Sequence, residues 1–303
     1  MRLGGIDLGG TKIEARLFDG PEARTIESRR IPTPRGDTDA LLDALAAQVR
    51  WLVDAAGAEV PVGLCLPGVI DPETGIVDAA NLPAGDRPLA LALEERTGLR
   101  LPLVHDGMAF ALSEARGGAG DGHRAVLGLI LGTGVGGGIC LDGQLPPRHA
   151  GLGLEVGHIG LPARALARHG LPLLRCGCGR EGCVEAYVSG TGLAALWRLR
   201  TGGQSPAEEV AASADPAAQE VLAVWADLAG EVLAGLHLVL DPGCVVLGGG
   251  LSRMAGVELR LAEALARHRL GTAGIPAIRV ARHGDSSGAR GAALLALETR
   301  LKG

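Results

Sequence analysis

The amino-acid sequence predicts an α/β protein with two similar halves. Strand-like and helix-like segments alternate along the 303 residues, which is typical of α/β architecture. A unit of strand, glycine turn and strand near the N-terminus recurs near the middle of the chain. Glycine is enriched, with 49 residues where average usage would give about 21. Many backbone positions therefore need to be free of a side chain, and the length suits two domains.

The first half reads as strands with helices between them. Residues 3–18 form a strand, a turn at Gly9 and Gly10, and a second strand, because apolar β-formers flank the glycine breaker. Residues 41–56 carry apolar side chains at helical spacing. The other expected elements are strands at 26–31, 60–66 and 101–104, and helices at 90–96 and 108–115.

The second half opens with the repeat of the strand–glycine–strand unit at residues 126–141. When the two units are aligned, Gly132-Thr133-Gly134 fall opposite Gly9-Gly10-Thr11. The other expected elements are a long helix at about 216–240, a strand at 244–247 before three glycines, and helices at 257–268 and 289–299. A glycine-rich segment around 117–124 is the expected boundary, which gives domains 1–117 and 118–303.

Composition argues against several classes of function. The net charge is −5 and no basic block is present, which argues against nucleic acid binding. Aromatic residues make up 2%, too few for base-stacking platforms or aromatic sugar clefts. The N-terminus has no long apolar segment, and the apolar stretches 125–131 and 232–240 are too short to span a bilayer. We therefore expect a soluble cytoplasmic protein without a membrane partner.

Three glycine turns, each directly after an apolar strand, point to an anion site. Glycine lets backbone N–H groups approach a phosphate closely, although a tight hairpin also uses glycine for geometry alone. None of the turns matches the Rossmann or P-loop pattern. Asp7 lies in an apolar strand beside the first turn, where an isolated carboxylate is costly. Mg²⁺ on a nucleotide phosphate would pair with it, and the alternative is that Asp7 caps its own turn.

A histidine and three cysteines have the composition of a zinc site. His158 is separated by 17 residues from Cys176, and Cys178 and Cys183 follow among Gly, Arg and Glu. Three thiolates and one imidazole form a tetrahedral Zn²⁺ set, and four protein ligands leave no open position. The sequence therefore predicts a structural rather than a catalytic zinc. The alternative is free cysteines beside an unrelated histidine.

Asp106 is the best candidate for a general base. It follows the strand expected at 101–104, and acids at the C-terminal ends of strands often line the clefts of α/β proteins. The alternative is an N-cap for the helix that begins near Met108.

The glycine turns and the cysteine pattern together resemble those of ROK-family sugar kinases. The segments Asp7-Leu-Gly-Gly-Thr-Lys12, 131–138 and 247–252 resemble the phosphate-1, phosphate-2 and adenosine segments of that family, in the same order. The resemblance implies the two-lobed actin/hexokinase-like (ribonuclease H-like) ATPase fold, with ATP and a sugar in an interlobe cleft. It assigns the ATP site, with its Mg²⁺, to Asp7, Gly9, Gly10, Thr11, Lys12, Gly132, Thr133, Gly134, Gly136, Gly249 and Gly250.

The resemblance also implies roles for the residues of a sugar site. Asp106 matches the family's catalytic aspartate, and the predicted zinc would fix the loop that carries sugar-binding groups. The implied sugar-contact residues are Asn81, His105, Asp106, Glu155, His158 and Glu185. The chain departs from the family pattern Asn-Asp-Ala-Asn, because it reads His105-Asp106-Gly107-Met108. The departure leaves the base in place and affects the side chains beside it, on which sugar specificity depends.

Within the family, the resemblance implies transfer of the ATP γ-phosphate to the 6-hydroxyl of N-acetyl-D-glucosamine. The long segment 161–175 between His158 and Cys176 supports this substrate, as do residues 32–35 and 281–293. Glucose, N-acetylmannosamine and fructose stay open as substrates, and so does a non-catalytic sugar sensor. The acidic charge argues against the family's DNA-binding repressors. The resemblance further implies a homodimer.

Overall fold

Two separate mixed sheets carry the strands that the sequence predicts. The computed structural model describes residues 1–20, 22–57, 59–79, 82–83 and 87–302. The chain divides into unit 1, which comprises Met1–Gly118, Gly143–Gly153 and Asp285–Gly303, and unit 2, which comprises Ala119–Asp142 and Leu154–Gly284. Each unit has its own sheet and its own apolar core.

The sheet of unit 1 has five strands in the order β3-β2-β1-β4-β7. β1, β2 and β3 are antiparallel neighbours, whereas β4 and β7 run parallel to β1. The bounds are β1 (Arg2–Leu8), β2 (Lys12–Asp19), β3 (Arg24–Pro32), β4 (Val62–Leu66) and β7 (Leu103–His105). The register sets Asp7 opposite Glu14 of β2 and Cys65 of β4. A separate short pair, β5 (Val69–Ile70) and β6 (Val77–Asp78), follows β4.

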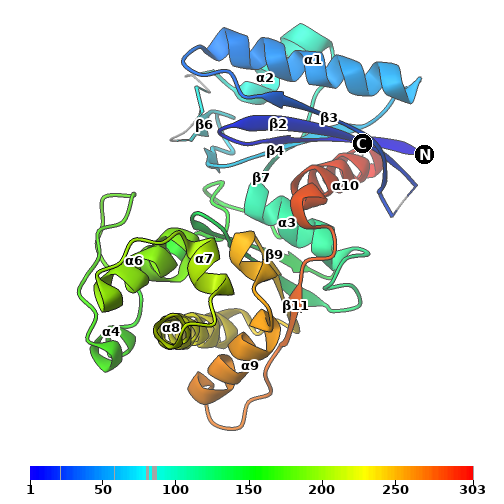
Figure 1. The fold of residues 1–303 in the computed structure, drawn as a ribbon. Helices are drawn as coiled ribbons and strands as arrows, with labels where there is room; N and C mark the ends of the chain where they lie inside the picture. Colours follow the sequence, from blue (N-terminus) through cyan, green and yellow to red (C-terminus); the bar gives the residue numbers. More distant parts are fainter. Residues whose placement is uncertain (21, 58, 80–81, 84–86, 303) are drawn as a thin grey trace. The chain divides into compact units, whose positions relative to one another are not determined.

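Helices cover both faces of this sheet (Figure 1). α1 (Thr38–Ala56) and α2 (Leu89–Thr97) lie on one face, and α3 (Asp106–Ala115) and α10 (Ser287–Lys302) lie on the other. The Asp37 side chain caps the start of α1, and Gly57 ends it in the left-handed conformation with φ 63°. The apolar face that the sequence predicts for α1, including Leu41, Leu45 and Leu52, is buried.

α10 comes from the far end of the chain and packs directly on β1 and β4. A Cβ built on Gly5 of β1 would lie 2.7 Å from the carbonyl carbon of Ala289, and one on Gly63 of β4 would lie 2.7 Å from that of Ala292. Both positions therefore need glycine because a helix backbone occupies the space of a side chain.

The sheet of unit 2 has four strands in the order β11-β10-β8-β9. β8 and β9 form an antiparallel hairpin, and β10 and β11 run parallel to β8. The bounds are β8 (Ala125–Leu131), β9 (Val135–Leu141), β10 (Cys244–Gly248) and β11 (Ala277–Val280). Each unit thus contains a hairpin around a glycine turn with a parallel strand beside its first strand, as the internal repeat predicts.

α8 (Pro216–Leu240) forms the centre of the core of unit 2. By length and composition it is the one helix among the described residues that could cross a membrane, but 72% of its most apolar window is buried. Its neighbours are packed helices, and Trp225 is fully buried. The remaining elements are α4 (Ala163–His169), α5 (Glu185–Val188), α6 (Gly190–Thr201), α7 (Ala207–Ala212), α9 (Val257–His268), η1 (Val156–His158), η2 (Gly250–Arg253) and η3 (Gly284–Ser286).

Candidate functional site

The first glycine turn joins β1 to β2 in unit 1. The Gly9 N–H donates to the Lys12 carbonyl at 2.9 Å, which closes the turn. Thr33, which follows β3, donates its hydroxyl to the Gly9 carbonyl at 2.6 Å and so fixes the turn from the side. Gly9 and Gly10 are partly exposed and Thr11 is exposed, so an anion can reach the backbone of this turn.

Within the described part of the chain, Asp7 forms no salt bridge, although the charge of Lys12 acts to lower its pKa. Cys65 donates its thiol to Oδ1 at 3.5 Å, which is a weak hydrogen bond for a carboxylate. Burial raises the pKa of Asp7 to about 6, and the negative charge of Asp106 adds to the rise. Among the described residues, no backbone N–H of the turn caps Asp7, which was the alternative interpretation. A divalent cation would supply the positive charge that this position lacks.

Asp106 is the first residue of α3, directly after β7. Its Oδ1 accepts the Gly107 N–H at 2.6 Å, and its side chain is 40% exposed. The N-cap of α3 is His105 rather than Asp106, because the His105 side chain accepts the Gly107 N–H at 3.1 Å from outside the helix. The Asp106 carboxylate is accessible and influences Asp7 electrostatically, which are the properties of a base that works beside a metal-bound phosphate.

In unit 2 the second and third glycine turns lie side by side. The Gly132 N–H donates to the Gly134 carbonyl at 3.0 Å in the turn between β8 and β9. Gly249 follows β10 with φ 80°, and a Cβ built on it would lie 2.5 Å from the Leu131 carbonyl carbon and 2.7 Å from the Gly132 nitrogen. Glycine is therefore required at 249 both by conformation and by the approach of the neighbouring turn.

These two turns border a cavity of about 460 Å³ in unit 2. Gly132, Thr133 and Gly250 form part of its wall, and small residues of α6 and α7 such as Ala194 and Ala207 form the opposite part. The volume is that of a small-molecule site, and the wall offers backbone groups and little bulk. Another cavity, of about 290 Å³ in unit 1, contains no residue of the predicted site.

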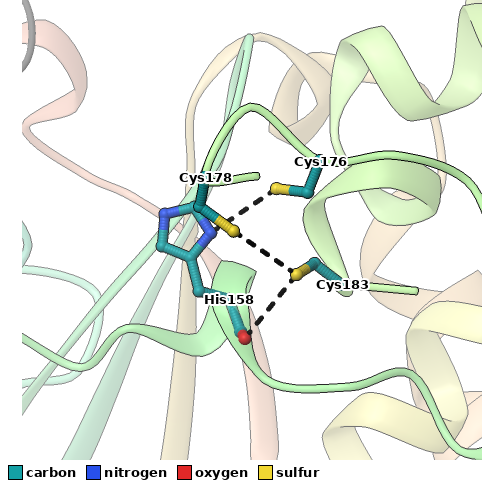
Figure 2. Close-up of side chains that lie close together, drawn as sticks. All are labelled: His158, Cys176, Cys178 and Cys183. Carbon is teal, nitrogen blue, oxygen red and sulfur yellow. Dashed lines mark hydrogen bonds between the residues drawn. The ribbon is translucent and has the colours of Figure 1, made fainter. Parts of the chain in front are cut away.

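The four predicted zinc ligands meet in unit 2 (Figure 2). One nitrogen or sulfur atom from each of His158, Cys176, Cys178 and Cys183 lies within 4.8 Å of the others. His158 Nδ1 is 3.7 Å from Cys176 Sγ, and Cys178 Sγ is 3.7 Å from Cys183 Sγ. Ligands about 2.3 Å from a tetrahedral zinc are about 3.8 Å apart, so these separations fit the ion.

The electrostatics of the cluster also suit a cation. The backbone N–H of Arg180 lowers the pKa of the exposed Cys178 thiol to about 6, whereas burial raises the pKa of Cys176. A cation would stabilise all three thiolates together.

Glu185 connects the cysteine cluster to the second glycine turn. Its Oε2 accepts the Val135 N–H at 3.0 Å, and its Oε1 accepts the Cys176 thiol at 3.7 Å. A Cβ built on Gly134 would lie 3.2 Å from the Glu185 carboxyl carbon, so a side chain there would displace this carboxylate. The order of the cluster and the order of this turn are therefore linked through one carboxylate.

The remaining predicted residues divide between the units. In unit 1, Nζ of Lys12 lies 3.8 Å from Oε2 of the buried residue Glu14. In unit 2, Gly136 pairs with Ile130 across the hairpin, and the Glu155 carbonyl accepts the His158 N–H at 3.0 Å. Asn81 lies outside the described residues.

Two residues beside the site were not predicted. Thr33 holds the first turn, and Gly288 of α10 leaves room beside Asp7, since a Cβ there would lie 2.7 Å from its Oδ2. The signal for Gly288 is its place in the glycine- and alanine-rich segment 281–293, but nothing local connects that segment with Asp7.

Comparison with known proteins adds relatives that span nearly the whole chain. Residues 3–299 match the model of the ROK family. The chain is 41% identical over 299 residues to the N-acetyl-D-glucosamine kinase of Escherichia fergusonii, with 97% of this chain and 98% of that protein covered. It is 40% identical over 296 residues to the N-acetylgalactosamine kinase AgaK of a Shewanella species, with 96% and 95% covered.

Solved structures give the same picture of the fold. A ROK hexokinase from Thermus thermophilus has a TM-score of 0.87 at 34% identity, with all of both chains covered. A ROK glucokinase from Streptomyces griseus in complex with glucose and AMPPNP has a TM-score of 0.79 at 30% identity, with 98% of this chain and 100% of that chain covered. The predicted fold class is confirmed.

Proposed function

The chain belongs to the ROK family, and from this premise we propose that it transfers the γ-phosphate of ATP to the 6-hydroxyl of N-acetyl-D-glucosamine. The products are ADP and N-acetyl-D-glucosamine 6-phosphate. The observation that carries the proposal is the 41% identity, over 97% of the chain, to an N-acetyl-D-glucosamine kinase. The accessible Asp106 carboxylate and the glycine turns supply the parts that such a reaction needs.

The nucleotide would bind in the cavity of unit 2. The turn at Gly132, Thr133 and Gly134 would hold phosphates, and Gly249 and Gly250 would admit the adenosine. In unit 1 the turn from Gly9 to Lys12 would by itself offer backbone N–H groups and an ammonium to an anion. The structural relative that was solved with AMPPNP supports nucleotide use.

Asp7 is the residue that would hold the Mg²⁺ of the nucleotide. Its buried carboxylate has a thiol as its hydrogen-bond donor and a second carboxylate nearby, so the position fits a hard divalent cation. When bound, Mg²⁺ supplies positive charge to the phosphate oxygens during phosphoryl transfer.

Asp106 would act as the general base. The 6-hydroxyl oxygen attacks the γ-phosphorus while its proton passes to the Asp106 carboxylate. The bond between the γ-phosphorus and the bridging oxygen breaks, and that oxygen keeps the electron pair as ADP leaves. The Gly107 N–H, which Asp106 Oδ1 accepts at 2.6 Å, holds the carboxylate in one orientation.

The sugar would be bound by the residues that the family resemblance assigns, namely Asn81, His105, Glu155, His158 and Glu185. The cluster of His158, Cys176, Cys178 and Cys183 would hold a structural Zn²⁺, because four protein ligands at tetrahedral separations leave no position for a substrate. The zinc would then position His158.

Phosphorylation of N-acetylgalactosamine is the second candidate function. The 40% identity to AgaK, over 96% of this chain, supports it almost as well, and the two sugars differ only in the configuration at C4. The base, the nucleotide site and the zinc cluster would serve either sugar.

A coupled ADP-release assay with Mg-ATP tests the proposal. The panel is N-acetylglucosamine, N-acetylgalactosamine, N-acetylmannosamine, glucose and fructose. The Asp106→Asn variant should lose at least ~10²-fold in kcat, because the amide cannot take the proton. Asp121→Asn, at an exposed position of unit 2, is the matched control and should keep wild-type kcat. Near-normal kcat in Asp106→Asn would remove Asp106 from the role of base.

A further inference from the structure

The ring of His105 occupies the space that a side chain at Gly153 would need. Both residues belong to unit 1, where Gly153 ends the segment Gly143–Gly153. A Cβ built on Gly153 would lie 2.5 Å from the Cε1 atom and 2.8 Å from the Cγ atom of the imidazole. Carbon atoms pack at about 3.5–4.0 Å, so the two side chains cannot coexist in this arrangement. Gly153 has no positive φ, so space alone excludes a larger residue.

The backbone around Gly153 is fixed and cannot easily withdraw. The Arg148 guanidinium donates to the carbonyls of Leu152 at 2.9 Å and of Gly153 at 2.8 Å. Gly151 is in the left-handed conformation with φ 68°, and a Cβ there would lie 2.6 Å from the Ile70 carbonyl carbon. A side chain added at 153 would therefore displace the His105 ring.

The orientation of the ring defines which hydrogen bonds it can make. His105 Nδ1 accepts the Gly107 N–H at 3.1 Å and lies 3.2 Å from Asp106 Oδ1. Nδ1 therefore lies beside a backbone donor and a carboxylate oxygen, and these two contacts fix the orientation of the ring. The side chain is 11% exposed, so only an edge of the ring is open beside the Asp106 carboxylate.

We propose that His105 and Gly153 together determine which acceptor sugar the protein selects. Gly153 lets the ring lie beside Asp106, so a rigid imidazole fills the space next to the proposed base. An asparagine side chain at 105 would be smaller and would present its donor and its acceptor on one flexible amide, whereas imidazole presents its two nitrogens on a rigid ring. The side chain at 105, in the position that Gly153 allows, therefore determines which sugar hydroxyls fit and pair beside Asp106. The inference rests on the proposed function, and Asp106 remains the base.

A double-mutant cycle tests the pairing. The proteins are wild type, Gly153→Ala, His105→Asn and the double variant, each measured with all five sugars. Gly153→Ala should lower kcat/KM for the preferred sugar at least ~10-fold and change the ratio between sugars, because the ring is displaced. Asparagine at 105 is smaller than histidine, so adding Gly153→Ala to His105→Asn should lower kcat/KM by less than ~3-fold. Gly235→Ala adds a Cβ with no neighbour within 4 Å and should match wild type.

Sugar ratios separate a specificity role from a structural one. A Gly153→Ala variant that loses kcat/KM equally for every sugar, or alanine effects that simply add across the cycle, would overturn the proposal.

The same proteins separate this inference from the proposed function. Turnover of any sugar with an unchanged sugar ratio across the cycle contradicts the pairing alone. Sugar binding by calorimetry without turnover contradicts the kinase, and the ratios of binding constants then test the pairing. A wild-type protein that binds none of the five sugars contradicts both.

Discussion

The position of Asp7 is electrostatically unfavourable for a charged carboxylate, because the group is buried. Its pKa in the folded protein, about 6, lies above the ordinary value of 3.8. The folded state therefore binds the proton more tightly, and stability falls as pH rises from about 3.8 to about 6. A shift of ~2 units corresponds to at most ~3 kcal/mol. We expect Asp7→Asn to raise the free energy of unfolding at pH 8 by up to that amount, and by much less at pH 4, in urea titrations.

The same substitution should lower activity, because the amide removes the charge that Mg²⁺ needs. Asp19→Asn, at the exposed end of the same hairpin, is the control and should change activity little. An Asp7→Asn protein with wild-type kcat/KM for ATP would show that Asp7 is not part of the nucleotide site. One that is less stable at pH 8 would contradict the raised pKa.

Some features around Asp7 and Asp106 could be predicted from the local sequence, and others could not. Asp106 at a strand end and Asp7 beside a glycine turn could be selected from pattern and spacing, because those features are local. The His105–Gly153 contact could not, because it depends on how the segment Gly143–Gly153 returns to unit 1. The N-cap position could not be predicted either, because the cap is His105 and an imidazole is an uncommon cap. The catalytic and binding roles themselves stay predictions.

At the scale of elements, an ionic cluster joins α4, α8 and α9. Glu231 of α8 is 0% exposed, and its carboxylate accepts hydrogen bonds from Arg164 and Arg168 of α4 at 2.7 Å each. His268 of α9 lies 3.4 Å from the same carboxylate. Burial alone would raise the pKa of Glu231, but the hydrogen bonds from Arg164 and Arg168 lower it. α4 lies in the segment between the predicted zinc ligands His158 and Cys176, so this ionic cluster supports that segment.

Removal of this charge should destabilise the protein. Glu231→Gln removes the buried carboxylate that Arg164 and Arg168 share, whereas Arg168 keeps Asp227 at 2.7 Å. Because the two arginine side chains are 66% and 40% exposed, we expect a loss of about 1–2 kcal/mol in urea unfolding at pH 7, less than for a fully buried pair. Because the folded pKa of Glu231 is lowered, its contribution is present above about pH 4.5 and is lost as pH falls further. Asp142→Asn, in the exposed Arg124–Asp142 pair, should leave stability unchanged. A Glu231→Gln protein as stable as wild type would show that the cluster contributes nothing.

Most elements could be predicted from the sequence, and the exceptions have physical reasons. The long amphipathic helices and the strands beside the glycine turns agree with α1, α8, α9, β1, β8 and β10, because periodicity is strong there. α4, α5, α7 and β11 were not predicted, since each has seven residues or fewer and is held by tertiary contacts rather than by local pattern. α6 was not predicted either, although it has 12 residues, because it opens with Gly190-Thr191-Gly192, which disfavour a helix. The packing of α10 on β1 and β4 brings together the two ends of the chain, which no local pattern reports.

At the scale of the whole molecule, the metal cluster should couple folding to function. We expect metal analysis to find one zinc ion per wild-type chain and to find it lost from Cys178→Ser, which lacks one of the four candidate ligands. Sugar binding should weaken as well, because His158 would lose its support. Cys140→Ser, at a buried cysteine outside the cluster, is the control and should retain zinc. Full sugar affinity in a zinc-free Cys178→Ser protein would show that the cluster does not organise the sugar site.

The central claim is that this protein phosphorylates N-acetyl-D-glucosamine at its 6-hydroxyl. The most direct measurement is a competition in which Mg-ATP is supplied with equimolar N-acetylglucosamine and N-acetylgalactosamine, and the products are identified by ¹H–³¹P correlation NMR. We expect N-acetyl-D-glucosamine 6-phosphate as the main product from wild type and none from Asp106→Asn. Preferential phosphorylation of N-acetylgalactosamine, a phosphate at another position, or no product would contradict the claim.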